Sequence, residues 1–326
     1  MIITRTPLRL SLAGGGTDLP AFYTETFGSV VSFAINKFVT VALSEKFDGK
    51  TRASYSITEN VETPELLQHD IIRESLRKFD VKGVEVVTVS DIPGEGSGLG
   101  SSSALAVGMA LGLRKWTGQS VNVHPALLAH EAYAVERLMC GHSCGKQDHF
   151  AAAYGGLHSY RFEMNEDVVV RPIYISEAQK NFLENDLMLF YTGRTRKAND
   201  LLVNMEARLR HDEIAQNLAI EIRDLAVELG NELINGNFQN ISHYLHQGWM
   251  LKRQMARGIT DPVLDEIYQT ALRAGAGGGK LVGAGGGGFF LFAGCWNHQT
   301  DIERALGLRR VHFKIEPQGS RIVYNG

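Results

Sequence analysis

Residues suited to holding a chain of phosphates gather in one short segment, residues 93–104. Four glycines alternate there with other residues, and three serines follow directly. A predicted strand precedes the segment and a predicted helix follows it, so the serines mark a helix N-terminus, where free N–H groups and the helix dipole attract anions. Glycines let the backbone close on an anion without Cβ clashes. We expect nucleotide phosphates to be bound by Gly96, Ser97, Gly98, Leu99, Gly100, Ser101, Ser102 and Ser103.

The alternatives to this interpretation fit the residues less well. A flexible loop followed by a serine N-cap accounts for one serine but not for the run of glycines. A Walker A loop needs Ser or Thr after Lys280, where Leu281 stands. The dinucleotide pattern matches formally within residues 283–288, but residues 289–293 are typical of a strand, not of the helix that receives a pyrophosphate. A nicotinamide oxidoreductase is therefore excluded.

The cysteines and histidines do not show the spacing of a metal site. Cys140 and Cys144 flank His142, yet no second ligand pair follows, so we do not expect zinc there. Three cysteines are also too few for a disulfide scaffold, which favours reduced thiols in a cytoplasmic protein. The other histidines, His149 among them, receive no role.

Composition narrows the class of protein. The net charge of −3 argues against a nucleic-acid binder, and no apolar run reaches the roughly 18 residues that a membrane span needs. The N-terminal stretch is typical of a strand and not of a signal peptide, because Arg5 and Arg9 interrupt its apolar residues. A chain of 326 residues suggests two domains, and a shift in pattern places them at residues 1–180 and 181–326.

Strands and helices must alternate to bring these residues together. In the first part, β-branched and aromatic runs predict strands, and apolar residues at helical spacing predict helices. The expected strands are 1–5, 30–33, 38–46, 84–89, 155–161 and 167–171, and the expected helices are 64–79, 101–116 and 125–139. The second part is expected to hold a strand at 186–191, helices over most of 196–257 and 262–274, and strands at 280–282, 289–293, 311–315 and 321–324. The order indicates two mixed domains.

Three glycine clusters occur in a defined order, within residues 5–18, 93–104 and 280–288. In this order they resemble the motifs of the GHMP kinases, a superfamily that includes galactokinase, homoserine kinase and mevalonate kinase. The resemblance spans essentially the whole chain. It implies an α+β fold of two domains, a ribosomal-protein-like N-terminal α/β domain that binds ATP and a ferredoxin-like C-terminal domain, with the active site in the interdomain cleft.

Within the superfamily, several stretches resemble the branch that acts on heptose 7-phosphate. They are Ala13–Pro20, Gly145–Phe150 with Ala151–Gly156, Phe190–Gly193 and Gly248–Lys252. The resemblance implies an ATP- and Mg²⁺-dependent kinase that phosphorylates the anomeric hydroxyl of this sugar phosphate, on the route to GDP-heptose. Gly16 stands where galactokinases carry His, which disfavours a simple galactose kinase.

Two other functions remain open. Fucokinase-like sugar 1-kinases share the Ala-Gly-Gly segment of the first motif. A non-catalytic sensor of sugar and ATP would have the same fold, but such a sensor could lose Asp148 or Glu136, and this chain keeps both.

The resemblance also assigns roles to single residues. It makes Asp148 the general base on the anomeric hydroxyl, with Arg9 as the basic residue beside it. Glu136 and Ser102 match the Mg²⁺ ligands of the family, and a mixed set of one carboxylate and one hydroxyl suits Mg²⁺. Glu131 stays an alternative, because the spacing from Glu136 to Asp148 is one residue longer than in mevalonate kinases. The structural alternative for each residue is a helix cap, an ion pair or a solvated face.

The sugar requires its own contacts. The resemblance assigns them to the first motif, and the third motif should shape the cleft near the acceptor. The residues are Gly15, Gly16, Thr17, Asp18 and Gly286. A phosphorylated sugar also needs cations, for which Arg194, Arg196 and Lys197 are candidates, with Lys37 and Lys280 as further ones. A charged helix start at the surface explains the arginines equally well. The expected partners are ATP and a sugar phosphate, and self-association is left open.

Overall fold

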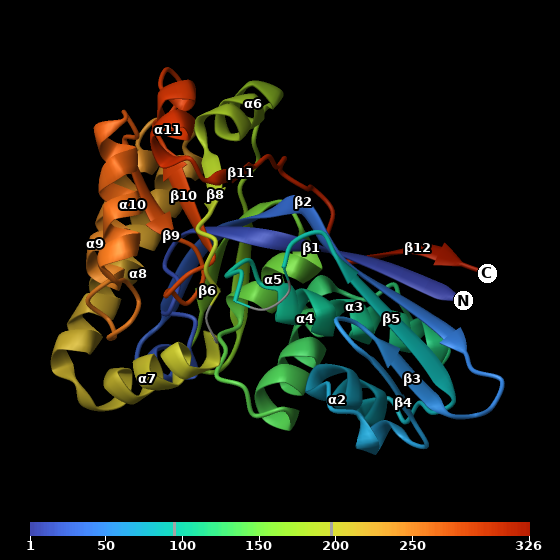
Figure 1. Ribbon diagram of the computed structural model, residues 1–326. Coiled ribbons are helices and arrows are strands. Elements are labelled where there is room, and N and C mark those ends of the chain that lie inside the picture. The colour runs from blue at the N-terminus through green and yellow to red at the C-terminus, as the bar shows by residue number, and fades with distance from the viewer. Residues whose placement is uncertain (94–95, 196–197) are drawn as a thin grey trace.

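Two β-sheets organise the molecule, and helices cover both (Figure 1). The structure is a computed structural model that describes residues 1–93, 96–195 and 198–326. The strands of the first sheet are β1 (Ile2–Ala13), β2 (Gly28–Glu45), β3 (Thr51–Ser54), β4 (Thr58–Val61), β5 (Val84–Ser90), β6 (Leu157–Phe162), β7 (Val168–Pro172) and β12 (Arg321–Asn325). The strands of the second sheet are β8 (Met188–Tyr191), β9 (Gly278–Leu281), β10 (Phe289–Ala293) and β11 (Arg309–Val311).

The helices that precede β6 in the chain are α1 (Pro20–Tyr23), η1 (Pro64–Leu66), α2 (Asp70–Lys78), α3 (Ser101–Trp116), α4 (Pro125–Tyr133), η2 (Ala134–Met139) and α5 (Gln147–Tyr154). Those that follow in the chain are α6 (Glu177–Asp186), α7 (Ala198–His211), α8 (Glu213–Ile234), α9 (Ile241–Lys252), α10 (Pro262–Arg273) and α11 (Gln299–Leu306).

The long strand β2 lies at the centre of the first sheet. Its first part pairs with β6, its second part pairs with β5, and β1 runs antiparallel along nearly its whole length. The sequence suggested two separate strands here. They form one strand because pairing with β1 resumes after an irregularity at Pro7/Leu8, so the chain bends without leaving the sheet.

Helix α3 packs directly on this sheet and begins at the predicted phosphate-binding segment. Its residues are buried over almost the full length, as its apolar pattern predicted. Two glycines inside the helix allow the close approach. A Cβ on Gly108 would lie 2.9 Å from Thr6 Oγ1 and one on Gly112 would lie 2.9 Å from Leu43 Cδ1. The first turn of α3 is therefore held in a defined position relative to β1.

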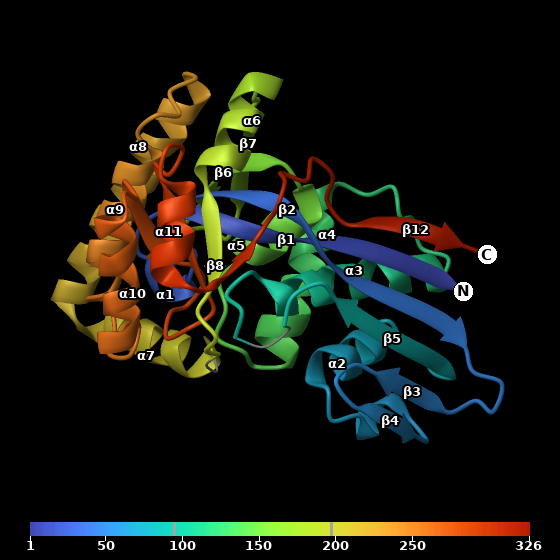
Figure 2. The same cartoon turned by 45° about the horizontal axis from the view of Figure 1, so that its top comes forward.

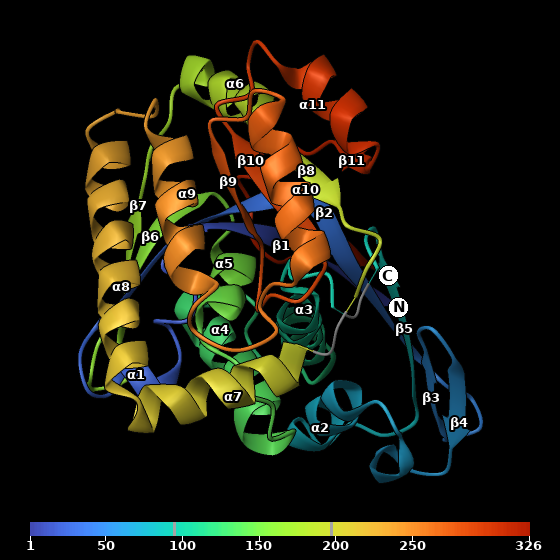
Figure 3. The ribbon, with the colours of Figure 1, turned by 60° about the vertical axis from the view of Figure 1, so that its left-hand side comes forward.

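The second sheet is antiparallel in the order β11-β8-β10-β9, and α9 and α10 pack against it, whereas α8 packs against β2 of the first sheet (Figure 3). Its core is aromatic, with Trp249 and Tyr268 packed against Phe290 and Phe292. The predicted α+β fold is confirmed. The last strand, β12, leaves this part and pairs with β1, so the two chain ends lie side by side (Figure 2). Among the described residues, no helix combines the length and the apolar character that a membrane crossing requires.

Candidate active site

A polar pocket lies between the two parts of the molecule and collects most of the predicted site residues. From the first part come β1, the turn that follows it, the loop before α3, η2 and the start of α5. From the second part come α7, α9, β9 and the loop after β9. The predicted residues that line it are Arg9, Gly15, Gly16, Asp18, Gly96, Ser97, Gly98, Gly100, Ser101, Ser102, Ser103, Glu136, Asp148 and Lys280.

The glycines before α3 adopt the conformation that only glycine takes easily. Gly96, Gly98 and Gly100 all have φ between 67° and 80°. A Cβ on Gly98 would collide with the Val282 carbonyl, so this loop touches the loop after β9 backbone to backbone. The first-turn amides of α3 have no intrahelical partner by helix geometry and face the same pocket. The pair of loops forms a narrow cradle that suits a phosphate chain.

Arg9 clamps Asp148 with two hydrogen bonds. Its Nε donates to Oδ1 over 2.6 Å and its Nη2 donates to Oδ2 over 2.7 Å. The same guanidinium donates to the Gly98 carbonyl over 2.5 Å, which ties the carboxylate to the glycine loop. Arg9 is buried, whereas Asp148 keeps 23% of its side chain exposed. A Cβ on Gly100 would lie 3.3 Å from Asp148 Cγ, so this carboxylate lies directly beside the start of α3.

Glu136 lies on a short π-helix, η2, which continues from α4. The predicted helix over 125–139 therefore changes its winding at the residue that carries the carboxylate, as π-helices often do at functional sites. Ser103 donates to Glu136 Oε2 over 2.8 Å, and His149 Nε2 lies 2.7 Å from the same oxygen. Burial raises the pKa of Glu136, but the neighbouring polar side chains of His142, His149 and Ser102 outweigh it and hold the pKa far below its usual value. The carboxylate is thus ionised.

Asp18 fixes the turn after β1 to the start of α5. Its carboxylate accepts hydrogen bonds from the Gly16 amide, the Gln147 amide and the Gln147 side chain, at 2.9–3.1 Å. Gly145 passes so close that a Cβ there would overlap this carboxylate. Burial raises the pKa of Asp18, and the nearby Asp148 charge raises it further, although the backbone hydrogen bonds oppose both. The site therefore holds three carboxylates, Asp18, Glu136 and Asp148, in different environments.

Two buried lysines come from the second part of the molecule. Lys252, at the end of α9, donates to the Gly283 carbonyl, and Lys280, on β9, donates to the Leu12 carbonyl over 3.4 Å. Burial lowers the pKa of Lys252 to about 8, with repulsion from Arg9 adding to the effect. Burial, Lys252 and Arg9 lower the pKa of Lys280 well below its usual value. Three cationic side chains thus converge where little water can solvate them.

Some pocket atoms lack partners within the described part of the chain. Ser11 Oγ and Gln147 Oε1 are buried and make no hydrogen bond to any described residue. Both residues line the pocket. Buried polar atoms are normally paired, so these two are suited to a polar ligand such as a sugar.

Other predicted residues lie outside the lining as far as the structure describes it. Thr17 turns its hydroxyl to the backbone, donating to the Gly14 and Ser29 carbonyls and accepting from the Ser29 amide. Leu99 is buried, and its carbonyl accepts from the Arg9 amide. Arg194 forms an ion pair with Asp261 at 2.8 Å.

Gly286 donates its amide to the Ile259 carbonyl, and Glu131 pairs with Arg114. Neither is among the described residues that line the pocket, and Lys37 is not either. Arg196 and Lys197 lie outside the described residues.

Sequence reasoning missed several lining residues. Lys252 was visible only as the last residue of the Gly248–Lys252 stretch, and nothing in its sequence context distinguishes it from a surface lysine. Ser11 and Gln147 flank predicted residues by one or two positions, so the signal was proximity alone.

Comparisons with known proteins agree with the geometry. The chain matches the GHMP kinases N terminal domain over residues 66–156 and the GHMP kinases C terminal domain over residues 231–307. A D-glycero-alpha-D-manno-heptose 7-phosphate kinase from Campylobacter jejuni is 32% identical over 304 residues, which is 89% of this chain and 88% of that protein.

Two further similarities extend this finding. A bifunctional fucokinase/GDP-fucose pyrophosphorylase from Arabidopsis thaliana is 26% identical over 93% of this chain but over only 30% of its own length. The crystal structure of a D-glycero-D-manno-heptose 1-phosphate kinase from Bacteroides thetaiotaomicron has a TM-score of 0.79 and 23% identity, with 100% of both chains covered. That structure shares the two-part fold, so the fold expected from the three motifs is confirmed.

Proposed function

This chain belongs to the GHMP kinases, and we propose that it transfers the γ-phosphoryl group of ATP to the anomeric hydroxyl of D-glycero-α-D-manno-heptose 7-phosphate. The product is the 1,7-bisphosphate. One observation carries the proposal: the Arg9-clamped Asp148 lies against the glycine loop at the start of α3, so a base and a phosphate cradle share one pocket.

The nucleotide tail is assigned to the cradle. Residues 96–100 approach the phosphates with backbone alone, and the first-turn amides of α3, at Ser101 to Ser103, donate to their oxygens. The positive end of the helix dipole adds to this attraction.

Mg²⁺ fits the residues beside the cradle. Glu136 and Ser102 both line the pocket, so a carboxylate oxygen and a neutral hydroxyl oxygen border it together. When bound, the ion would neutralise charge on the phosphate oxygens. Glu136 and Ser102 would hold it, and Ser103 keeps the carboxylate oriented through its 2.8 Å bond.

Asp148 accepts the proton of the anomeric hydroxyl as the oxygen attacks the γ-phosphorus, and the bond from phosphorus to the ADP oxygen breaks. Anomeric hydroxyls are more acidic than ordinary alcohols, so a carboxylate suffices as the base. Arg9 holds both carboxylate oxygens and fixes the orientation of the group. Lys252 and Lys280 supply positive charge around the transferring group.

The sugar is assigned to the turn after β1 and the start of α5. Gly15, Gly16 and Asp18 line that side of the pocket, and Ser11 Oγ and Gln147 Oε1 offer acceptors that no described residue uses. Thr17 and Gly286 are also proposed to contact the sugar, but neither lines the pocket as described, so each has to move toward it. Arg194 stays the candidate for the sugar phosphate, on the condition that it exchanges Asp261 for that phosphate.

A fucokinase-like sugar 1-kinase is the second candidate, since the fucokinase similarity also spans most of this chain. The identity and mutual coverage of the heptose 7-phosphate kinase favour the first. A sensor without turnover is disfavoured, because Asp148 and Glu136 both face the pocket. The proposed substrates place the reaction in the cytoplasm, and the proposal makes no requirement for a homo-oligomer.

A substrate panel tests the proposal. Purified protein is incubated with ATP, Mg²⁺ and, in separate reactions, heptose 7-phosphate, free fucose, galactose and mevalonate, and the products are followed by ³¹P NMR. We expect a new glycosyl phosphate signal beside the 7-phosphate signal, and none with Asp148→Asn. Turnover of free fucose with none of heptose 7-phosphate would transfer the assignment to the second candidate.

A further inference from the structure

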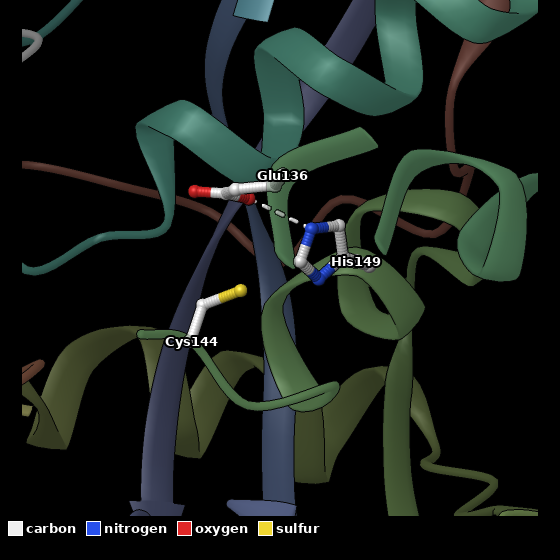
Figure 4. A group of neighbouring side chains, drawn as sticks. All are labelled: Glu136, Cys144 and His149. Atoms are coloured by element: carbon white, nitrogen blue, oxygen red, sulfur yellow. Dashed lines mark ion pairs between the residues drawn. The ribbon is translucent and has the colours of Figure 1, made fainter. Parts of the chain in front are cut away.

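Glu136, Cys144 and His149 come together beside the pocket, each with a different kind of ligand atom (Figure 4). Glu136 comes from η2, Cys144 from the loop before α5 and His149 from α5 itself. One carboxylate oxygen, the thiol sulfur and one ring nitrogen all lie within 4.8 Å of one another. In Figure 4 the sulfur points toward the space that the carboxylate and the ring border.

The environment of His149 is unusual. The side chain is fully buried, and its Nε2 lies 2.7 Å from Glu136 Oε2, but the contact is not aligned for a hydrogen bond. Neither ring nitrogen has a hydrogen-bond partner among the residues that the structure describes. Buried polar groups are normally satisfied. A buried, unpartnered imidazole nitrogen beside a carboxylate and a thiol is an arrangement that suits a bound cation.

The donor types identify the class of cation. Mg²⁺ selects oxygen ligands, whereas sulfur and imidazole nitrogen select Zn²⁺ and ions like it. With Zn–S near 2.3 Å and Zn–N near 2.0–2.1 Å, ligand atoms of one tetrahedral ion lie about 3.5 Å apart. The widest spacing, up to 4.8 Å, has to shorten by about 1.3 Å, and His149 Nε2 and Glu136 Oε2, now 2.7 Å apart, have to move apart by a little less than 1 Å. Cys144 can supply the shortening, since residues 141–145 form neither helix nor strand.

We propose that Glu136, Cys144 and His149 bind one zinc-type divalent cation, with three protein ligands and a fourth position open to the pocket. Glu136 and Cys144 line the pocket, which gives the ion a route in, and three ligands with an open position are typical of reactive zinc sites. On binding, the Cys144 thiol releases its proton to solvent and the sulfur–metal bond forms. No change of oxidation state is involved.

Glu136 belongs both to this cluster and, under the proposed function, to the Mg²⁺ site. An ion held by Cys144 and His149 occupies the carboxylate that we assign to Mg²⁺. Zinc should therefore inhibit the kinase reaction even when Mg²⁺ is in excess.

The binding test uses cobalt and zinc without ATP or sugar, so its result does not depend on the kinase assignment. Co²⁺ is added to the reduced, metal-free full-length protein, and absorption is recorded in the near ultraviolet, where a thiolate-to-cobalt charge-transfer band appears. Zn²⁺ affinity is then measured by competition. Cys144→Ser and His149→Gln are the test variants, and Cys140→Ser, which changes a half-buried cysteine outside the cluster, is the matched control.

We expect one Co²⁺ per chain with the band in the wild type and in Cys140→Ser, and loss of the band in Cys144→Ser. Each test variant should weaken Zn²⁺ binding by at least about tenfold, since even losing a partner of a ligand costs that much. A wild type without the band, a band that survives Cys144→Ser, or unchanged Zn²⁺ affinity in His149→Gln overturns the proposal and leaves the cluster an ion pair beside a thiol. Circular dichroism of each variant shows that the fold is retained.

The kinase assay gives a separate reading. Zinc inhibition of the wild type that is relieved in Cys144→Ser supports the consequence for Glu136. Inhibition that is identical in both proteins contradicts it, even where the binding test succeeds.

Discussion

Replacing Lys252 by Met should change how the stability of the protein depends on pH. The pKa of this lysine falls from 10.5 in the unfolded chain to about 8 in the folded one. Between these values the unfolded chain binds more protons, so the free energy of unfolding of the wild type rises with pH. A shift of this size corresponds to about 3 kcal/mol at 1.36 kcal/mol per pKa unit, of which about 2 kcal/mol is recovered between pH values near 7 and 9.5. Lys252→Met lacks this gain.

The measurement is urea unfolding without ligand at several pH values across that window, for the wild type and for Lys252→Met. The difference between the two proteins is the quantity of interest, because every other group titrates in both. The substitution also leaves the Gly283 carbonyl without its donor, at a cost of about 1–3 kcal/mol at every pH. The change of the difference with pH is therefore more informative than its value at one pH. Exposed Lys78→Met is the matched control and should follow the wild type.

Parallel pH curves for wild type and Lys252→Met would refute the reasoning, because they would mean that the ammonium is as well solvated when folded as when unfolded. The pKa of Lys252 also links stability to nucleotide binding. A phosphate group placed between the cationic side chains should raise the pKa of Lys252 again, so saturating ATP and Mg²⁺ should reduce the pH dependence of wild-type stability.

Three further outcomes are expected. Asp148→Asn should lower kcat by roughly 10²–10⁴ while calorimetry still detects ATP binding, and an unchanged kcat would remove Asp148 from the role of base. Thr17→Val should lower the free energy of unfolding in urea by about 1–3 kcal/mol, because the Gly14 and Ser29 backbone groups lose their buried partner; full stability would contradict the buried bonds. Gly98→Ala should raise the KM for ATP, since φ of 74° and the Val282 carbonyl leave no room for a Cβ, and wild-type kinetics would show that the cradle is looser than described.

The glycine loop before α3, which we propose as the phosphate cradle, could be predicted from sequence because its geometry is local. A glycine run, a helix N-terminus and the serines that begin α3 are contiguous, so the order of residues determines which atoms border the pocket. The start of α3 at Ser101 was predicted to the residue for the same reason. The neighbouring turn shows the limit of this approach. Thr17 and Asp18 are adjacent, and both are polar. The Thr17 hydroxyl nevertheless bonds to backbone carbonyls inside the turn, whereas the Asp18 side chain lines the pocket.

Lys252, which sequence reasoning missed, illustrates a different property, which is burial at a distance along the chain. Lys252 and Lys280 lie on different elements and meet Arg9 only when the second sheet docks beside β1. A lysine in a sequence is by default a solvated charge, because burial of an ammonium is costly unless something compensates it. Two such side chains buried together beside an arginine suit an anionic ligand, and the phosphates of the nucleotide that we propose would supply the compensating negative charge.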